Sequence, residues 1–237
     1  MSPSNSASTP LPASQQRTRI KMCGFTREAD VRAACALGAD AIGFVLYPPS
    51  PRSVSIERAA ELARLLPSFV TPVLLFVNEA PERIEAACAA VPGALLQFHG
   101  DESAEFCAAM TLRTGRPHLK AARIPLSEVH DFDLLEFAQV HHSAQAILLD
   151  AHVDGYGGGG KTFHWSLLPT NVNAHLVLSG GLTPANVGDG IRALRTHGQS
   201  LAVDVSSGIE AGKGLKDADK MRQFVQAVRT ADNAFSV

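Results

Sequence analysis

A thiol and a carboxyl group form a candidate acid–base pair. Cys23 comes directly after the expected strand Arg19–Met22, and Asp150 follows the apolar run Ile147–Leu149. A free thiol, with a pKa of about 8.5, is mostly protonated at neutral pH, whereas a free carboxyl group, with a pKa of about 3.9, is ionised. A thiol base and a carboxylic acid donor therefore need the first pKa lowered and the second raised, and Lys21 is expected to give no direct help because adjacent strand residues face opposite sides. As structural residues, Cys23 would be a small buried side chain and Asp150 a helix cap or salt-bridge partner.

Two further features are suited to anions. Arg52 follows three prolines in a stiff loop, where its guanidinium can bind a carboxylate through two hydrogen bonds. The pairs Gly180-Gly181 and Ser207-Gly208 each lead toward an expected helix, and small residues let backbone N–H groups approach an oxyanion. The sequence therefore predicts sites for a carboxylate and a phosphate. The alternatives are a solvated arginine and glycines that only make tight turns.

Neither a metal nor a cofactor is expected. His99 and Asp101 lack a further histidine or carboxylate at ligand spacing, and neither glycine loop carries a nucleotide-binding fingerprint. His99 and Asp204 end two expected strands and are retained as substrate-binding candidates. The Gly155–Gly160 run, which includes Tyr156, is interpreted either as a flap over the site or as a flexible linker.

The elements that must position these residues follow a repeated pattern of short apolar run, polar or glycine-rich turn, and longer segment with helical spacing. Several runs are apolar throughout, which is typical of strands covered on both faces and paired in parallel. Eight strands are expected, at Arg19–Met22, Ala41–Leu46, Val73–Val77, Leu95–Phe98, His118–Ala122, Ala146–Leu149, His175–Leu178 and Leu201–Val205.

Helical segments are expected between the strands. Thr183 before Pro184, and Asp217, are expected to cap two of them. One closed (β/α)8 barrel (a TIM barrel), of class α/β, explains eight such units without a linker, and a doubly wound open sheet is the alternative. In a barrel, the carboxyl ends of the strands carry the site. The expected helices are Glu28–Leu37, Ile56–Leu66, Pro81–Val91, Ser103–Leu112, Asp133–Val140, Phe163–Leu168, Pro184–Leu194 and Ala218–Arg229.

Composition narrows the classes of partner. The 237 residues include 21 basic and 23 acidic ones, a net charge of −2 with no long run of one sign, so neither nucleic acid nor a membrane is an expected partner. The longest apolar run is far shorter than the roughly 20 residues that cross a bilayer. The four cysteines are interpreted as reduced thiols of a cytoplasmic protein. Residues 1–17 are expected to be a disordered Ser/Pro-rich tail, and residues 18–237 one catalytic barrel domain.

Seven motifs in a fixed order carry a resemblance to a known family. From Ile20 to about Arg229 the sequence resembles the phosphoribosylanthranilate isomerases of tryptophan biosynthesis. Each motif is weak alone, but each stands at the end of an expected strand. The motifs are KMCGFT (21–26), DAIGFVLYPPSPRSVS (40–55), LLFVN (74–78), LLQFHGDE (95–102), LLDAHVDGYGGGGKTFHW (148–165), LSGGLTPANV (178–187) and DVSSGIEAGKGLKD (204–217).

The resemblance implies an Amadori rearrangement, in which the aminoaldose N-(5-phosphoribosyl)anthranilate becomes a 1-deoxyribulose 5-phosphate aminoketose without a cofactor. It implies that Asp150 protonates the furanose ring oxygen and that Cys23 removes the C2′ proton. By the same resemblance, Arg52 engages the anthranilate carboxylate. The phosphate is then held by the loops with Gly181 and with Ser207-Gly208.

Three other interpretations are weighed against this one. A metal-dependent pentose-phosphate epimerase would need a His/Asp ligand set, and an indoleglycerol phosphate synthase would need a lysine acid and glutamates at strand ends. A non-catalytic binding protein for phosphorylated sugars would keep the glycine loops but would have no use for Cys23 together with Asp150. The expected partner is a small phosphorylated substrate, and the protein is expected to be a monomer or a homodimer.

Overall fold

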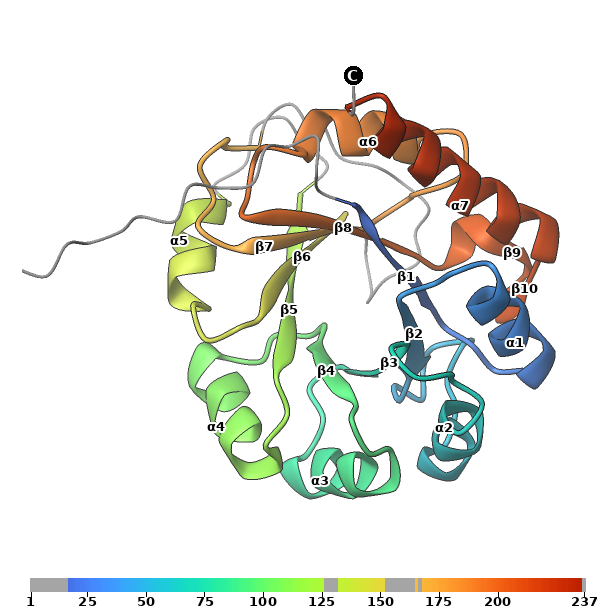
Figure 1. Cartoon of the computed structure of the whole chain (residues 1–237). Coiled ribbons are helices and arrows are strands. Elements are labelled where there is room, and N and C mark those ends of the chain that lie inside the picture. Colours follow the sequence, from blue (N-terminus) through green and yellow to red (C-terminus); the bar gives the residue numbers. More distant parts are fainter. Residues whose placement is uncertain (1–16, 126–131, 152–164, 166–167, 236–237) are drawn as a thin grey trace, which may run out of the picture.

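Eight parallel strands close into a barrel in the computed structural model, which describes residues 17–125, 132–151, 165 and 168–235. Each strand pairs with the next along the chain, and pairing between the first and the eighth completes the ring (Figure 1). The predicted closed barrel is confirmed, and the open sheet is excluded. The strands are β1 (Arg19–Cys23), β2 (Ala41–Val45), β3 (Thr71–Phe76), β4 (Leu95–Phe98), β5 (His118–Ile124), β6 (Ala146–Ala151), β7 (His175–Leu178) and β8 (Ser200–Val205).

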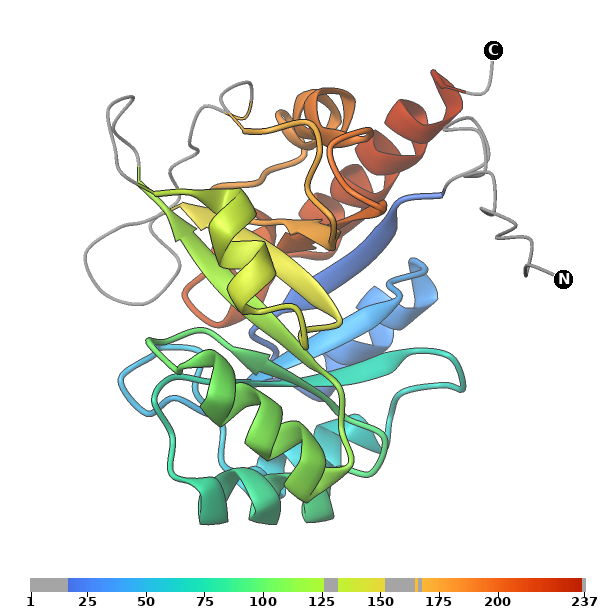
Figure 2. The same cartoon turned by 90° about the vertical axis from the view of Figure 1, so that its left-hand side faces the viewer.

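Helices surround the barrel, and the side view shows the strands tilted between them (Figure 2). The large apolar core lies between strands and helices, where the outward-facing strand residues pack. A much smaller apolar cluster fills the inside of the barrel, around Leu119, Leu148 and Val177. The helices are α1 (Glu28–Ala36), α2 (Ile56–Ala63), α3 (Pro81–Ala90), α4 (Ala104–Thr114), α5 (Leu134–Val140), α6 (Val187–Leu194) and α7 (Ala218–Asn233).

Side-chain caps fix where several helices begin. The Asp217 carboxylate accepts hydrogen bonds from the backbone N–H groups of Asp219 and Lys220, as the sequence predicted. The predicted Thr183 cap is wrong, because α6 begins at Val187 rather than at Pro184. Asn186 folds back instead, and its Oδ1 accepts a hydrogen bond of 2.8 Å from the Thr183 N–H. This hydrogen bond closes a separate turn, at residues 183–186, directly before α6.

The chain between β8 and α7 differs from expectation. Ser207-Gly208 was expected to lead toward a helix, but it forms a single 3-10 turn, η3 (Ser207–Ile209). A small hairpin of β9 (Glu210–Gly212) and β10 (Leu215–Lys216) follows before α7 begins. The dipole of α7 therefore does not act at this loop.

Three predictions concern residues that the structure does not describe in full. The tail (1–16 of its 17 residues), the glycine run at 155–160 and most of the helix expected at 163–168 lie outside the described residues. Within the described ranges, no helix is long and apolar enough to cross a membrane. The same ranges hold no group of three or more His, Cys, Asp or Glu side chains that could bind a metal ion.

Candidate active site

A cavity opens at the carboxyl ends of the strands, where a barrel carries its chemistry. It encloses about 680 Å³, including the space at its mouth. Alternate residues of a strand face the same side, so the last inward-facing residues of successive strands converge there. Seven of the eight candidate residues line it: Cys23, Arg52, His99, Asp150, Gly181, Asp204 and Ser207.

Gly208, the eighth candidate, lies behind the cavity wall. A Cβ atom at this position would stand 1.9 Å from the backbone oxygen of Leu182. Glycine therefore allows η3 to pack directly on the loop after β7, which brings Ser207 and Gly181 to the same wall of the cavity. Gly181 and Ser207, two of the small residues expected at a phosphate site, therefore lie together at the cavity. Gly208 contributes by letting the backbone of η3 pack against Leu182.

Cys23 ends β1 and is 4% exposed. Its Sγ lies against β2, where a Cβ atom on Gly43 would come within 2.5 Å of the sulfur. Burial raises the pKa of the Cys23 thiol, while the positive charges of Lys21 and Lys216 act in the opposite direction and Asp204 adds to the rise. Because this pKa is raised above that of a free thiol, Cys23 is protonated at neutral pH.

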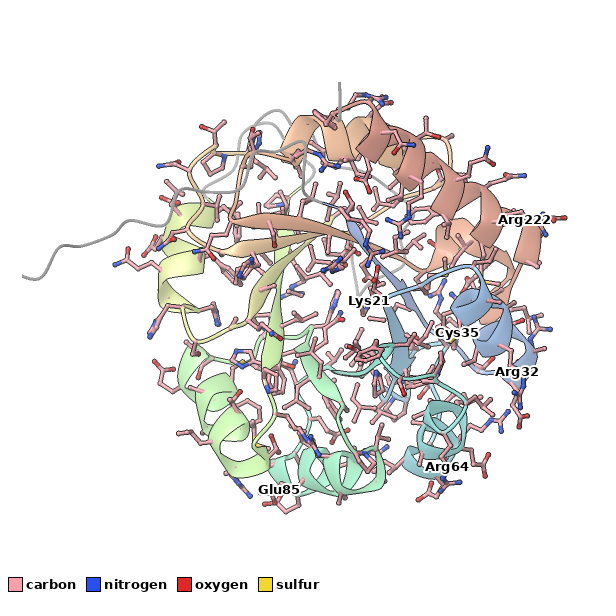
Figure 3. The ribbon with its side chains drawn as sticks, viewed as in Figure 1. Lys21, Arg32, Cys35, Arg64, Glu85 and Arg222 are labelled. Atoms are coloured by element: carbon pink, nitrogen blue, oxygen red, sulfur yellow. The ribbon has the colours of Figure 1, made fainter. Side chains whose placement is uncertain are left out.

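The sequence-based view of Lys21 is wrong. Lys21 and Cys23 are two residues apart on one strand, so both side chains point into the barrel. Figure 3 shows Lys21 toward the middle of the ring, whereas Arg32 and Arg222 lie on outer helices. The Lys21 ammonium lies near the thiol and helps to lower its pKa.

Asp204 holds Lys21 in this position. Lys21 Nζ donates a hydrogen bond of 2.8 Å to Asp204 Oδ1, and each side chain is 6% exposed. Asp204 Oδ2 accepts a longer hydrogen bond, 3.3 Å, from the Ser179 hydroxyl. This candidate residue thus reaches the cavity as one half of a buried ion pair, and its charge is largely matched by Lys21.

Asp150 belongs to a polar chain that crosses from β6 to β4. His99 Nε2 lies 2.9 Å from Asp150 Oδ2, and His99 Nδ1 lies 2.9 Å from Gln97 Nε2. When the Gln97 amide donates to Nδ1, the histidine carries its proton on Nε2 and donates it to Asp150. Gly180 allows the next loop to come close, because a Cβ atom there would stand 2.8 Å from Asp150 Oδ1.

Arg52 already has a protein partner. Its Nε and Nη2 each donate a hydrogen bond of 2.8 Å to the Glu210 carboxylate. The Arg52 backbone N–H donates to the Ser50 hydroxyl, which stabilises the loop after β2. The guanidinium is therefore held on one edge, and its side chain is 11% exposed.

Three residues of the site were missed in the sequence, Gln97, Glu210 and Lys216, and Lys21 was placed on the wrong face of its strand. Lys21 and Gln97 stand two residues before Cys23 and His99, so strict alternation along a strand would have placed them on the inner face. Glu210 and Lys216 had no such signal, because the hairpin that carries them was not expected.

The arrangement supports proton transfer on a substrate with two anionic ends. A thiol from β1 and a carboxyl group from β6 face one cavity, with an arginine above β2 and small residues at the ends of β7 and β8. Two ionisable groups in different surroundings are suited to separate acid and base roles.

Comparisons with known proteins point to one family of enzymes. A sequence model of the family described as "PRAI: N-(5'phosphoribosyl)anthranilate (PRA) isomerase" matches residues 20–227. The N-(5'-phosphoribosyl)anthranilate isomerase of Methylibium petroleiphilum is 60% identical over 216 residues, which cover 91% of this chain and 96% of that protein. The enzyme of that name from Dechloromonas aromatica is 56% identical over 218 residues, 92% of this chain and 99% of that one.

Solved structures show the same relationship. The crystal structure of phosphoribosyl anthranilate isomerase from Thermotoga maritima superposes with a TM-score of 0.78 at 40% identity, and the match covers 90% of this chain and 99% of that one. A second structure of a phosphoribosyl anthranilate isomerase is a complex with reduced 1-(o-carboxyphenylamino)-1-deoxyribulose 5-phosphate. Its TM-score is 0.75 at 37% identity, with the same coverage of the two chains.

Proposed function

The chain belongs to the N-(5'-phosphoribosyl)anthranilate isomerase family, and from this premise we propose which of its residues carry out the reaction. The enzyme is an aldose–ketose isomerase of tryptophan biosynthesis. It converts N-(5-phosphoribosyl)anthranilate to 1-(2-carboxyphenylamino)-1-deoxyribulose 5-phosphate. Substrate and product are isomers: the reaction moves protons, opens the furanose ring and forms one C=O bond, so it needs no external oxidant or reductant.

Asp150 is the general acid in this proposal. It gives its proton to the furanose ring oxygen while the ring C1′–O bond breaks, and the nitrogen lone pair forms the C=N bond of a Schiff base. His99 donates a hydrogen bond to Asp150 and fixes the direction of the carboxyl group. Asp150 is buried, 6% exposed, so its carboxyl group meets the substrate away from bulk water.

Cys23 is the general base. It removes the C2′ proton of the Schiff base, and the electrons of that C–H bond form the enamine while the iminium nitrogen is neutralised. The resulting enolamine tautomerises to the ketone. The thiol needs a lowered pKa for this step, and Lys21 and Lys216 are the charges that act in that direction.

The two ends of the substrate have separate sites in the proposal. Arg52 binds the anthranilate carboxylate with the part of its guanidinium that Glu210 leaves free. Gly181, Ser207 and Gly208 form the phosphate site. His99 and Asp204 border the sugar between them.

The observation that carries the proposal is that the Cys23 thiol and the Asp150 carboxyl group face one cavity from different strands. The experiment follows the loss of fluorescence of phosphoribosylanthranilate generated in situ, with purified wild type, Cys23→Ser and Asp150→Asn. We expect each variant to lower kcat by at least about a hundredfold, as lost acid–base catalysis does. Near-normal turnover in either folded variant removes that residue from its role.

Assembly and cellular location complete the proposal. We infer a cytoplasmic enzyme that is a monomer or a homodimer; a similar crystal structure from Thermotoga maritima, 36% identical to this chain, is of monomers generated from a dimeric phosphoribosylanthranilate isomerase. Sedimentation equilibrium on the full chain at micromolar concentration separates the two states. A larger assembly would contradict both.

A further inference from the structure

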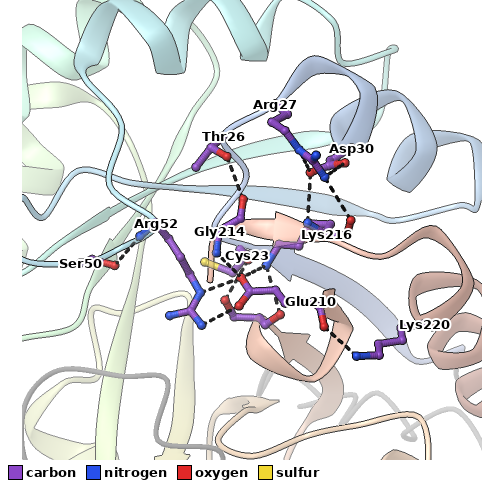
Figure 4. A network of polar contacts seen from close by, with 11 residues as sticks. Cys23, Thr26, Arg27, Asp30, Ser50, Arg52, Glu210, Gly214, Lys216 and Lys220 are labelled. Carbon is purple, nitrogen blue, oxygen red and sulfur yellow. Dashed lines mark hydrogen bonds and ion pairs between the residues drawn. The ribbon is translucent and has the colours of Figure 1, made fainter. Parts of the chain in front are cut away.

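A buried charge network joins Arg52 to the hairpin after β8 (Figure 4). Glu210 accepts two hydrogen bonds of 2.8 Å from Arg52, and its Oε1 also accepts one of 2.9 Å from Lys216 Nζ. The Gly214 N–H adds a longer contact of 3.3 Å. The side chain of Lys216 is 0% exposed and that of Glu210 is 5% exposed. One carboxylate therefore holds two cations where almost no water reaches.

The network decides which part of the Arg52 guanidinium is available. A guanidinium can offer one edge through Nε and Nη2 and a second edge through Nη1 and Nη2. Glu210 occupies the first edge, so the second edge remains for a ligand in the cavity that Arg52 lines. Gly24 leaves room for the arginine stem, because a Cβ atom there would stand 2.6 Å from Arg52 Cδ.

The charges of the network do not cancel. Arg52 and Lys216 contribute two positive charges and Glu210 one negative charge, which leaves one positive charge beside the cavity. A single carboxylate on a ligand would neutralise it. Pairing stabilises buried charges, so a carboxylate on a ligand would bind favourably beside Arg52.

Lys216 also attaches the network to the rest of the site. Its Nζ donates a hydrogen bond of 3.1 Å to the Ser206 backbone oxygen, and the Ser206 hydroxyl donates one of 3.0 Å to the Cys23 backbone oxygen. The backbone N–H of Lys216 donates a hydrogen bond to the Asp30 carboxylate, which also forms an ion pair with Arg27. These contacts hold the hairpin against β1 and α1, so Glu210 has a fixed position from which to orient Arg52.

We propose that Glu210, held by Lys216, is a positioning residue that selects substrates carrying an aromatic carboxylate, because it fixes Arg52 with its Nη1–Nη2 edge toward the cavity. This inference rests on the proposed function, in which Arg52 binds that carboxylate. Glu210 itself does not touch the substrate and acts through Arg52. If Glu210 had a purely structural role, it would hold the hairpin of β9 and β10 in place without orienting Arg52.

The first test compares Glu210→Gln with the double variant Glu210→Gln/Lys216→Met. The single variant leaves two buried cations without a carboxylate, which endangers folding. The double variant removes one charge of each sign and keeps the local net charge of the wild type. We expect the double variant to raise KM at least about tenfold, because Arg52 loses the carboxylate that orients it. Because Lys216 is also one of the cations that lower the pKa of Cys23, kcat is expected to fall as well, and KM is the readout of the test. An unchanged KM in a folded double variant overturns the proposal.

A double-mutant cycle shows whether the effect passes through Arg52. Arg52→Ala alone is expected to raise KM, and adding Glu210→Gln/Lys216→Met to it is expected to raise KM no further, because residues that act through one contact are not additive. Additive increases would mean a structural role and would overturn the inference. Thermal unfolding of each variant verifies that the proteins compared are folded.

The last measurement uses ligands rather than turnover. The probes are the reduced 1-(o-carboxyphenylamino)-1-deoxyribulose 5-phosphate and the same compound without its carboxyl group, titrated calorimetrically into wild type and the double variant. We expect the double variant to lose at least about tenfold in affinity for the first probe and less than about twofold for the second. Equal losses for both overturn the inference. A folded wild type that neither turns over substrate nor binds the first probe overturns the proposed function instead.

Discussion

The protonation of Cys23 is decided by charges on three neighbouring elements. Burial raises the pKa of the thiol, Lys21 on the same strand and Lys216 on β10 lower it, and Asp204 on β8 raises it. A thiol reacts with an alkylating agent as the thiolate, so its reactivity follows its ionised fraction. We therefore expect the alkylation rate of Cys23 to keep increasing with pH beyond the pKa of about 8.5 that is typical of a free thiol.

Lys21→Met tests the origin of this pH dependence. The variant removes a cation beside the thiol and leaves Asp204 without Lys21, and both changes raise the pKa of Cys23, so the rise of its ionised fraction should move to higher pH. The rate of Cys23 alkylation by iodoacetamide, followed by peptide mass spectrometry across the same pH range, should move with it. The matched control, Lys21→Met/Asp204→Asn, removes both charges and should lie closer to wild type. A thiol profile that is the same in all three proteins would exclude Lys21 from this role.

At the level of single residues, the sequence predicted which side chains line the cavity better than it predicted their partners. Cys23, Asp150 and Arg52 could be placed there because each ends a strand or follows one. Lys21 was placed on the wrong face although the period of a strand puts it beside Cys23. Glu210 could not be found in this way, since its contact with Arg52 joins positions 158 residues apart.

Among the elements, strands and most helices were predictable from apolar spacing and caps. All eight strands of the barrel lie where expected to within about two residues at either end, as is usual for boundaries. The hairpin of β9 and β10 was not predictable because its strands have three and two residues, too few to show a period. It owes its place to the buried contacts of Glu210 and Lys216 rather than to its own sequence pattern.

The turn at η3 depends on the absence of a side chain at Gly208. A methyl group there would collide with the Leu182 backbone oxygen, at a separation of 1.9 Å, and backbone cannot move aside as a side chain can. We expect Gly208→Ala to raise KM for the phosphorylated substrate at least about tenfold and to lower Tm by several degrees, as a loss of about 1–2 kcal/mol would. The assay and a thermal unfolding scan measure the two effects.

Gly212 provides the matched control, because it belongs to the adjoining hairpin. A Cβ atom there would meet only Leu215 Cδ1, at an ordinary 3.9 Å. Gly212→Ala should therefore leave Tm and KM near the wild-type values. If Gly208→Ala behaved like Gly212→Ala, the close approach of η3 to Leu182 would have no part in binding the phosphate.

For the whole molecule, a buried histidine predicts sensitivity to acid. His118 is fully buried at the start of β5, its Nδ1 lies 2.7 Å from the Thr111 hydroxyl, and no partner for its Nε2 is found in the described part of the chain. Burial first, then the nearby His141 and Lys120, lower its pKa to about 4. Because the folded pKa lies below the unfolded value, this contribution to stability is complete above about pH 6.5 and is lost as pH falls toward 4.

Urea unfolding at pH 7 and pH 4.5 measures this loss. Wild type should lose on the order of 2–3 kcal/mol more of its unfolding free energy between these values than His118→Gln, which does not titrate there. Carboxyl groups titrate in both proteins, so the difference between the two isolates the histidine. An equal loss in both proteins would show that His118 does not carry the acid response.

The pairing of β1 with β8 places the active site across the junction between the two ends of the chain. Lys21 meets Asp204 over 183 residues of sequence, Arg52 meets Glu210 over 158, and Thr18 meets Asp232 over 214. Such distant contacts cannot form until the later partner has been made, and a growing chain emerges from the ribosome N-terminus first. Cys23 and Arg52 leave the ribosome early. The residues that set their charge environment, Asp204 and Glu210, are synthesised only near the end of the chain. Catalytic activity is therefore one of the last properties to appear during synthesis. A chain interrupted before β8 would lack part of the active site and would be inactive.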